Sequence, residues 1–305
     1  MEKGISRMKA RFFRVRFSDN GKGIYHTLAY RDEIEKTCVH LSYLSEGGEE
    51  PSATSYPIDI LVAADLGEDT LEKLETMTKS HSIGILYLPK TEEEISVLRR
   101  IQDKVGEVHL LEEGKTISWK EGLWEFWLGN LGGCLSLYHG YAGTKELGED
   151  CVYVGRIYGP EDFCSPCILE NERDHCGFGC THHRDFHLLK AHNDSRYVGF
   201  RTGTLLLGRS VFRGQLERLL GEISPMREQI RVIQLPHHIE AWDREILKLV
   251  PEGEIQYYVG HTEHEVRISG GIASHNGYCR YVPVNRTSGL CLFGYFIPFL
   301  REKNC

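Results

Sequence analysis

Residues 58–106 alternate twice between a short apolar run and an amphipathic stretch. The apolar runs are IDILVAAD (58–65) and SIGILYLP (82–89), and both have the length of a strand. Residues 70–81 and 91–106 follow them, with apolar side chains at helical spacing in the first and a capping box at the start of the second. Strands that alternate with helices in this way predict an α/β sheet with helices packed on its outside.

Strand-like segments fill much of the remaining chain. Residues 10–17 and 23–31 predict two paired strands joined by the turn SDNGKG. The basic run Lys9, Arg11, Arg14 and Arg16 is expected on the polar face of the first strand. Further predicted strands lie in EVHLLEEG, TISW, LWEFWLGN, CLSLYHG, CVYVGRIYG, GTLLLG, RVIQLP and IQYYVG. Further helices are predicted over residues 210–223 and 241–250.

Composition excludes several kinds of protein. The 305 residues carry a net charge of −8, which argues against a broad nucleic-acid surface, since such a surface needs a basic footprint. The sequence contains no apolar run long enough to span a membrane and no secretory signal, so we expect a cytoplasmic protein without membrane partners. In that setting, ten cysteines favour thiols and metal binding over disulfides.

Residues 164–187, CSPCILENERDHCGFGCTHHRDFH, form a cysteine- and histidine-rich insert. Two cysteine pairs supply the four soft ligands of a closed tetrahedral site, so the spacing predicts one structural zinc ion per chain. The expected ligands are Cys164, Cys167, Cys176 and Cys180, with His182 as the reserve ligand. The alternative is a group of surface or buried thiols without metal.

Aromatic residues concentrate in a second region, where Trp119, Trp124, Phe126 and Trp127 lie within two predicted strands. Core packing is favoured over ligand stacking for these four side chains.

Further along the chain, His237 and His238 follow a predicted strand in QLPHHIEAW. They are candidates for metal ligands or for a general base, or are loop histidines without chemistry.

The order of a strand, an acidic turn and a helix, then LLLG and a helix, then a strand ending in PHH, resembles the metallo-β-lactamase fold. The nearest branch contains the competence-type and nuclease-like hydrolases. The resemblance covers residues 8–300 as a single domain and implies an αββα sandwich, with residues 164–187 as an insert within it.

In that family, a His-x-His-x-Asp-His turn binds two zinc ions that activate a water. In this chain Asp65, Gly67 and Thr70 stand where the three histidines would be, and Asp69 keeps the place of the aspartate. A zinc site needs about three nitrogen, sulfur or carboxylate ligands from the protein, so the resemblance implies a centre that has lost most of its ligands.

Two later motifs are also altered. Arg209 stands where the family has an aspartate that bridges the metals, and Ile239 replaces a glycine after the retained His237 and His238. A guanidinium carries a permanent positive charge where two dications would need negative ligands. We expect Arg209 to pair with Asp65 or Asp69, or to hold a small anionic ligand.

These features predict a non-catalytic protein that acts by binding, as a sensor, adaptor or assembly subunit beside a protein partner or as a homo-oligomer. A bacterial defence system is one setting in which hydrolase-like folds of this kind occur. The alternative is a rewired single-metal phosphodiesterase or nuclease that uses Asp65, Asp69, His237 and His238, with Arg209 gripping a phosphate. In either case, GTLLLG and IDILVAAD are expected to end at the same rim of the sheet.

Overall fold

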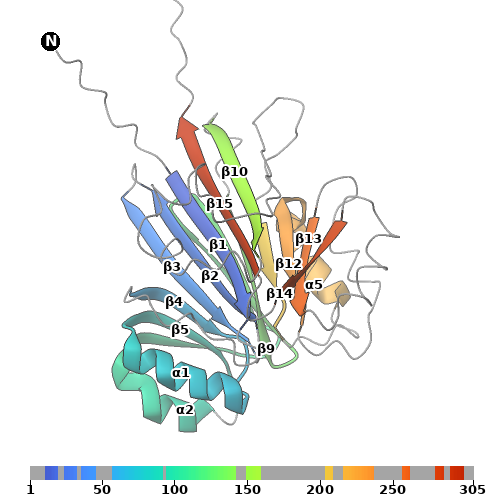
Figure 1. Cartoon of the computed structure of the whole chain (residues 1–305). Helices are drawn as coiled ribbons and strands as arrows, with labels where there is room; N and C mark the ends of the chain where they lie inside the picture. Colours follow the sequence, from blue (N-terminus) through green and yellow to red (C-terminus); the bar gives the residue numbers. More distant parts are fainter. Residues whose placement is uncertain are drawn as a thin grey trace, which may run out of the picture.

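A computed structural model describes the chain in eleven segments, which form a mixed α/β structure dominated by two sheets (Figure 1). The described residues are 11–19, 24–32, 36–45, 57–91, 94–141, 149–158, 203–208, 216–236, 256–261, 279–284 and 289–298.

The first sheet has eight strands in the order β10-β15-β1-β2-β3-β4-β5-β6. Their bounds are β1 (Arg11–Asp19), β2 (Ile24–Asp32), β3 (Thr37–Leu44), β4 (Ile58–Ala63), β5 (Ile83–Pro89), β6 (Val105–Leu111), β10 (Glu149–Tyr158) and β15 (Gly289–Pro298). Neighbours are antiparallel from β10 to β3 and parallel from β3 to β6. The parallel half contains the predicted alternation of strands and helices.

The second sheet has seven strands in the order β14-β13-β12-β11-β9-β8-β7. Their bounds are β7 (Thr116–Glu121), β8 (Trp124–Leu131), β9 (Cys134–Tyr141), β11 (Gly203–Leu206), β12 (Ile230–Gln234), β13 (Gln256–His261) and β14 (Cys279–Val284). The strands from β11 to β14 are parallel, and β7, β8, β9 and β11 are antiparallel neighbours.

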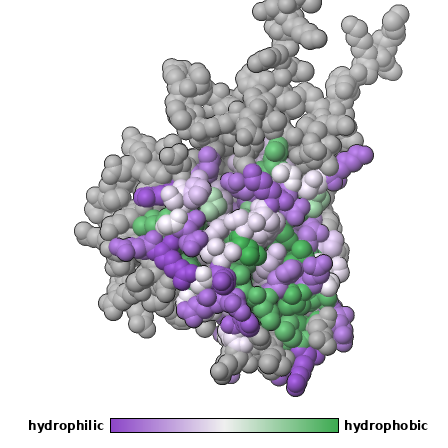
Figure 2. All heavy atoms as spheres, turned by 180° about the vertical axis from the view of Figure 1, so that it is seen from behind, coloured by the Kyte–Doolittle hydropathy of each residue, from purple (hydrophilic) through white to green (hydrophobic). Residues whose placement is uncertain are grey.

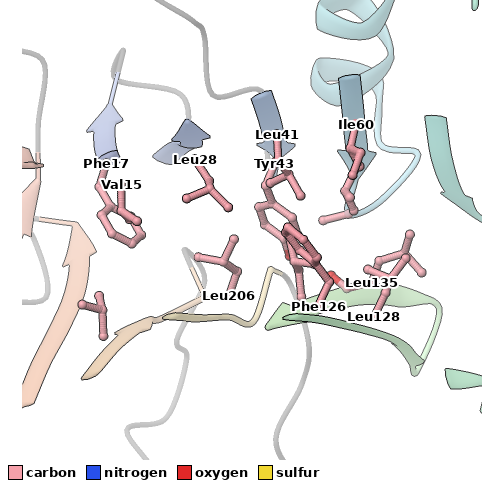
Figure 3. Packing of buried hydrophobic residues seen from close by; sticks show 14 of the residues in the cluster. Val15, Phe17, Leu28, Leu41, Tyr43, Ile60, Phe126, Leu128, Leu135 and Leu206 are labelled. Atoms are coloured by element: carbon pink, nitrogen blue, oxygen red, sulfur yellow. The ribbon is translucent and has the colours of Figure 1, made fainter. Parts of the chain in front are cut away.

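The two sheets pack face to face around the largest hydrophobic cluster. Figure 3 shows Phe17, Leu28 and Tyr43 of the first sheet pointing toward Phe126 and Leu206 of the second. All five side chains are at most 1% exposed. This clustering follows from the period of two along each strand, because every second residue of both sheets faces the shared core.

Among the described residues, helices pack on part of the outer face of each sheet (Figure 1). Two helices, α1 (Glu68–Ser80) and α2 (Glu94–Ile101), pack on the eight-stranded sheet, where Leu74 of α1 joins a cluster with residues of β4 and β5. On the other sheet, α5 (Leu216–Glu222) is followed by the 3-10 helix η3 (Ser224–Gln229), and Leu219 packs in a cluster with residues of β11 and β12. Within the described part of the chain, no helix is long and apolar enough to cross a membrane.

Most of the predicted elements are confirmed, with three corrections. The helix predicted over residues 91–106 ends at Ile101, and after one 3-10 turn Val105 already begins β6. The helix ends early because Val105 pairs with Ile83 of β5 and so belongs to the sheet. Strand β3 was not predicted. The described part of residues 210–223 is helical from Leu216, whereas residues 241–250 lie outside the described residues.

The polar face of β1 is the third correction. Phe13, Val15 and Phe17 alternate and are buried in the core between the sheets, as the pattern predicts. Arg16 points to the opposite face, yet it is only 7% exposed. The alternation of the sequence therefore gives the direction of the Arg16 side chain correctly, but not its burial.

Candidate functional site

Asp65 lies in the turn between β4 and α1, and its carboxylate holds that turn together. Its Oδ1 atom accepts hydrogen bonds from the backbone N–H of Gly67 and from the hydroxyl of Thr70, both at 2.9 Å. Asp65 is 7% exposed and Thr70 is fully buried. A buried carboxylate needs donors of this kind, because its desolvation is otherwise unfavourable.

The ends of β4 and β11 meet at one rim between the sheets. Gly208, which follows β11, has a φ of +55°, and a Cβ atom built on it would lie 3.2 Å from the Cβ of Ala64, which follows β4. The backbone N–H of Leu135 also donates to the carbonyl of Ala64 at 2.7 Å. The ends of GTLLLG and IDILVAAD therefore lie together, but the prediction that they share the rim of one sheet is wrong, because β4 and β11 belong to different sheets.

Tyr43 and Cys134 complete the described part of this rim. The Tyr43 hydroxyl donates to the carbonyl of Leu135 at 2.7 Å. Burial raises the pKa of Tyr43 well above its usual value, and Cys134 and Asp65 raise it further. Tyr43 therefore stays a protonated donor, because a second negative charge beside Asp65 would be unfavourable in this buried environment.

The described positions do not fit the two-metal centre of the family that the sequence resembles. Gly67 has no side chain, the hydroxyl of Thr70 donates to Asp65, and Asp69 is exposed at the start of α1. No three His, Cys, Asp or Glu side chains among the described residues gather as they would around a metal ion.

Several predicted site residues lie outside the described residues. They are Arg209, His237 and His238 of the altered motifs, and Cys164, Cys167, Cys176, Cys180 and His182 of the insert. The described chain does approach the histidine pair, because β12 runs parallel to β11 and Leu206 pairs with Gln234. The residue before the pair, Pro236, is buried.

A second polar pair, between the sheets, was not predicted as a site. The Nε2 atoms of His26 and His139 lie 2.8 Å apart, and the two rings are stacked with their centroids 5.0 Å apart. Both side chains are fully buried. Within the described part of the chain, the Nδ1 atom of each ring has no hydrogen-bond partner.

Both imidazoles of this pair are neutral. Burial lowers the pKa of His26 well below its usual value, with a further contribution from His139. Burial alone lowers the pKa of His139 to about 3. The alternation of the two strands marks each histidine as facing inward, but no signal in the sequence pairs residues that are 113 positions apart.

The described site thus consists of a hydrogen-bonded turn, a closely packed rim and a neutral histidine pair. Of these, only the rim joins two separate segments that the sequence motifs associate with one another. No protein-family model and no curated protein matches this chain.

Proposed function

We propose that this chain is a catalytically degenerate protein on a metallo-β-lactamase-like αββα scaffold and that it acts by binding. The layer order supports the scaffold, since helices flank two sheets whose facing sides share one core. The meeting of the ends of β4 and β11 also supports it, because the resemblance expects its site where these two strands end.

The observation that carries the loss of catalysis is the hydrogen bond from Thr70 to Asp65. These two residues stand where the resemblance expects the first and third histidine ligands. Here they bond to each other at 2.9 Å in a buried turn. A carboxylate oxygen engaged by two local donors is a weaker metal ligand, and a threonine hydroxyl is a poor substitute for imidazole.

Two further features belong to the proposal. Arg209 would hold an anionic group or one of the nearby aspartates, because a guanidinium beside carboxylates forms charge-assisted hydrogen bonds. The insert would hold one structural zinc ion through Cys164, Cys167, Cys176 and Cys180, whose closed coordination would leave no open position for chemistry.

The test is a count of metal ions in the purified full-length protein. Elemental analysis of the wild type and of a His237→Ala/His238→Ala variant should give the same zinc content, about one ion per chain. A His81→Ala/His109→Ala variant is the matched control, because His81 directly follows the C-terminal end of α1 and His109 lies on β6, away from the rim. A second metal ion that disappears only in the His237/His238 variant would support the single-metal hydrolase instead.

An activity assay separates the same two alternatives. Wild type and Arg209→Asp would be offered a phosphodiester, a cyclic nucleotide and a β-lactam with added zinc or manganese. We expect no turnover by either protein, since restoring one carboxylate does not supply the donors that Gly67 and Thr70 lack. Metal-dependent turnover by the wild type that is lost in the His237→Ala/His238→Ala variant would overturn the proposal.

A further inference from the structure

The strands β6 and β7 form one edge of the molecule. β6 ends the eight-stranded sheet and β7 ends the seven-stranded sheet, and a short turn joins them, closed by a hydrogen bond from Lys115 N–H to the Glu112 carbonyl. The chain therefore passes from one sheet to the other at this corner. The outer backbone edge of β7 pairs with no strand of the described chain.

A stack of aromatic rings runs from this edge into the core. His109 stacks on Tyr87, Tyr87 on Trp119, and Trp119 on Phe126, with ring centroids 5.0 to 5.4 Å apart. Phe126 is 1% exposed, Trp119 is partly exposed and half of the His109 side chain is exposed. Thus the stack is anchored in the core and presents its other end to solvent.

Two carboxylates flank the outer part of the stack. Glu107 lies two residues before His109 on β6, and Glu121 lies two residues after Trp119 on β7. Burial raises the pKa of Tyr87, and the negative charges of Glu107 and Glu121 raise it further, so both carboxylates act on the Tyr87 hydroxyl. β6 and β7, which belong to different sheets, thus each bring one carboxylate near the ring of Tyr87.

Tyr87 itself has unused hydrogen-bonding capacity. It is 8% exposed, and its hydroxyl has no hydrogen-bond partner among the described residues. Glu107 forms a hydrogen bond with His109 at 3.2 Å, and Glu121 forms no ion pair with a lysine or arginine in the described part of the chain. A phenol oxygen of this kind can accept a hydrogen bond from a donor of a ligand.

We propose that the β6–β7 edge binds an arginine side chain carried by an extended, basic segment of a partner protein. A guanidinium stacks on an aromatic face, donates to carboxylates in its own plane and can donate to a phenol oxygen. The partly exposed rings of His109 and Trp119, the Tyr87 hydroxyl and the carboxylates of Glu107 and Glu121 would supply these three kinds of contact. The segment would be extended because the unpaired edge of β7 offers its backbone groups to a further strand.

The charge of the whole chain favours such a partner, since a net charge of −8 attracts basic segments. Figure 2 shows hydrophilic and hydrophobic atoms side by side across the face opposite to that of Figure 1. An arginine side chain suits an edge where carboxylates lie beside aromatic rings, because it is apolar along the stem and charged at the tip. The inference gives the proposed binding role a partner class, but it uses no residue of the β4–β11 rim.

The experiment measures binding of a short peptide of alternating valine and arginine to the full-length protein by calorimetry at low ionic strength. A peptide in which citrulline replaces arginine keeps the shape and removes the charge. We expect saturable binding of the arginine peptide and binding of the citrulline peptide that is at least about tenfold weaker. Raising the salt concentration should weaken the binding of the arginine peptide and leave the binding of the citrulline peptide unchanged.

Two variants assign the binding to this edge. We expect the affinity for the arginine peptide to fall by about tenfold in two variants, Glu107→Gln/Glu121→Gln and Trp119→Leu. Glu68→Gln/Glu72→Gln on α1 makes the same change of charge away from the edge and should leave binding unchanged. Circular dichroism would verify that each variant is folded.

Three results would overturn the inference. They are no binding of the arginine peptide at millimolar concentration, equal binding of the two peptides, and binding that survives in the Glu107/Glu121 variant. The first two would show that the aromatic stack only closes the core. None of them bears on the metal count or the hydrolysis assay, so the proposed function can fail or stand separately.

Discussion

His26 of β2 and His139 of β9 join the two sheets through a 2.8 Å contact between their Nε2 atoms. Because both rings are neutral, one Nε2 atom carries a proton and donates it to the other, which accepts. Phe17, Trp124 and Phe126 surround the pair at ring-centroid distances of 4.6 to 6.5 Å. The pair thus forms a polar contact between the two sheets in an aromatic part of the core.

Acid should weaken this link. In the unfolded chain each histidine takes up a proton near pH 6.5, whereas in the folded protein the pKa of His139 is about 3. The contribution of His139 to stability is therefore complete above about pH 6.5 and is lost as the pH falls toward 3, by about 1.4 kcal/mol per pH unit, and the lowered pKa of His26 acts in the same direction. Urea unfolding at pH 7, 6 and 5 would measure it.

The control for this prediction is a His26→Leu/His139→Leu variant. Its free energy of unfolding should fall less steeply between pH 7 and 5, because the carboxylates of the protein still titrate but the pair does not. An identical slope in the two proteins would refute the prediction.

The two histidines should also be energetically coupled. His26→Leu or His139→Leu alone leaves one buried nitrogen without its partner and should cost about 1 to 3 kcal/mol. The double variant removes both polar groups, so it should cost less than the sum of the two single variants. Unfolding measurements at pH 7 on all four proteins give the coupling energy, and additivity within about 0.5 kcal/mol would argue against the pair.

The Asp65 turn should depend on Thr70. Thr70→Val keeps the shape of the side chain and removes the hydroxyl that donates to Asp65, so it should lower the free energy of unfolding by about 1 to 2 kcal/mol. Thr76→Val on the same helix is the control, because that hydroxyl bonds to the Glu72 carbonyl at an exposed position. Its effect should stay within about 0.5 kcal/mol. Equal losses would show that Thr70 has no special role.

The rim should not tolerate a side chain at Gly208. Gly208→Ala would place a Cβ atom 2.7 Å from the Tyr43 hydroxyl and 2.9 Å from the Cys134 sulfur, at a φ of +55°. We expect a loss of about 2 to 4 kcal/mol from the strained backbone and the crowded core. Gly221→Ala in α5 meets nothing within 4 Å and should stabilise the protein by about 0.5 kcal/mol. Similar effects of the two changes would contradict the closely packed rim.

Removing an insert cysteine should release zinc. Cys164→Ser or Cys176→Ser would take one thiolate from the proposed closed site, and the insert would lose the folding energy that the metal supplies. Elemental analysis should show less than the wild-type zinc content, and the melting temperature should fall. Cys38→Ser on β3 changes an exposed thiol outside the insert and serves as the control. A Cys164 variant with its full metal content and an unchanged melting temperature would exclude the structural zinc ion.

Local sequence patterns were sufficient for elements whose neighbours along the chain decide their structure. The strand IDILVA and the helix after it were predicted because an apolar run of strand length and a 3.6-residue period are properties of a few consecutive residues. Glu68 and Asp69 in the first turn of α1 and Lys79 in its last turn agree with the helix dipole. The same reasoning failed for the end of α2, where pairing of Val105 with β5 overrides the helical pattern.

Tertiary structure decided every relationship between distant residues. It placed β15 beside β1, pairing Arg11 with Phe296 near the two ends of the chain. It assigned β4 and β11 to different sheets and still brought Ala64 and Gly208 together. Sequence alone marks each of these strands as buried, because burial depends on the side chains of one segment. It does not select the partner, because many apolar surfaces bury equally well and only the packing of the whole chain distinguishes among them.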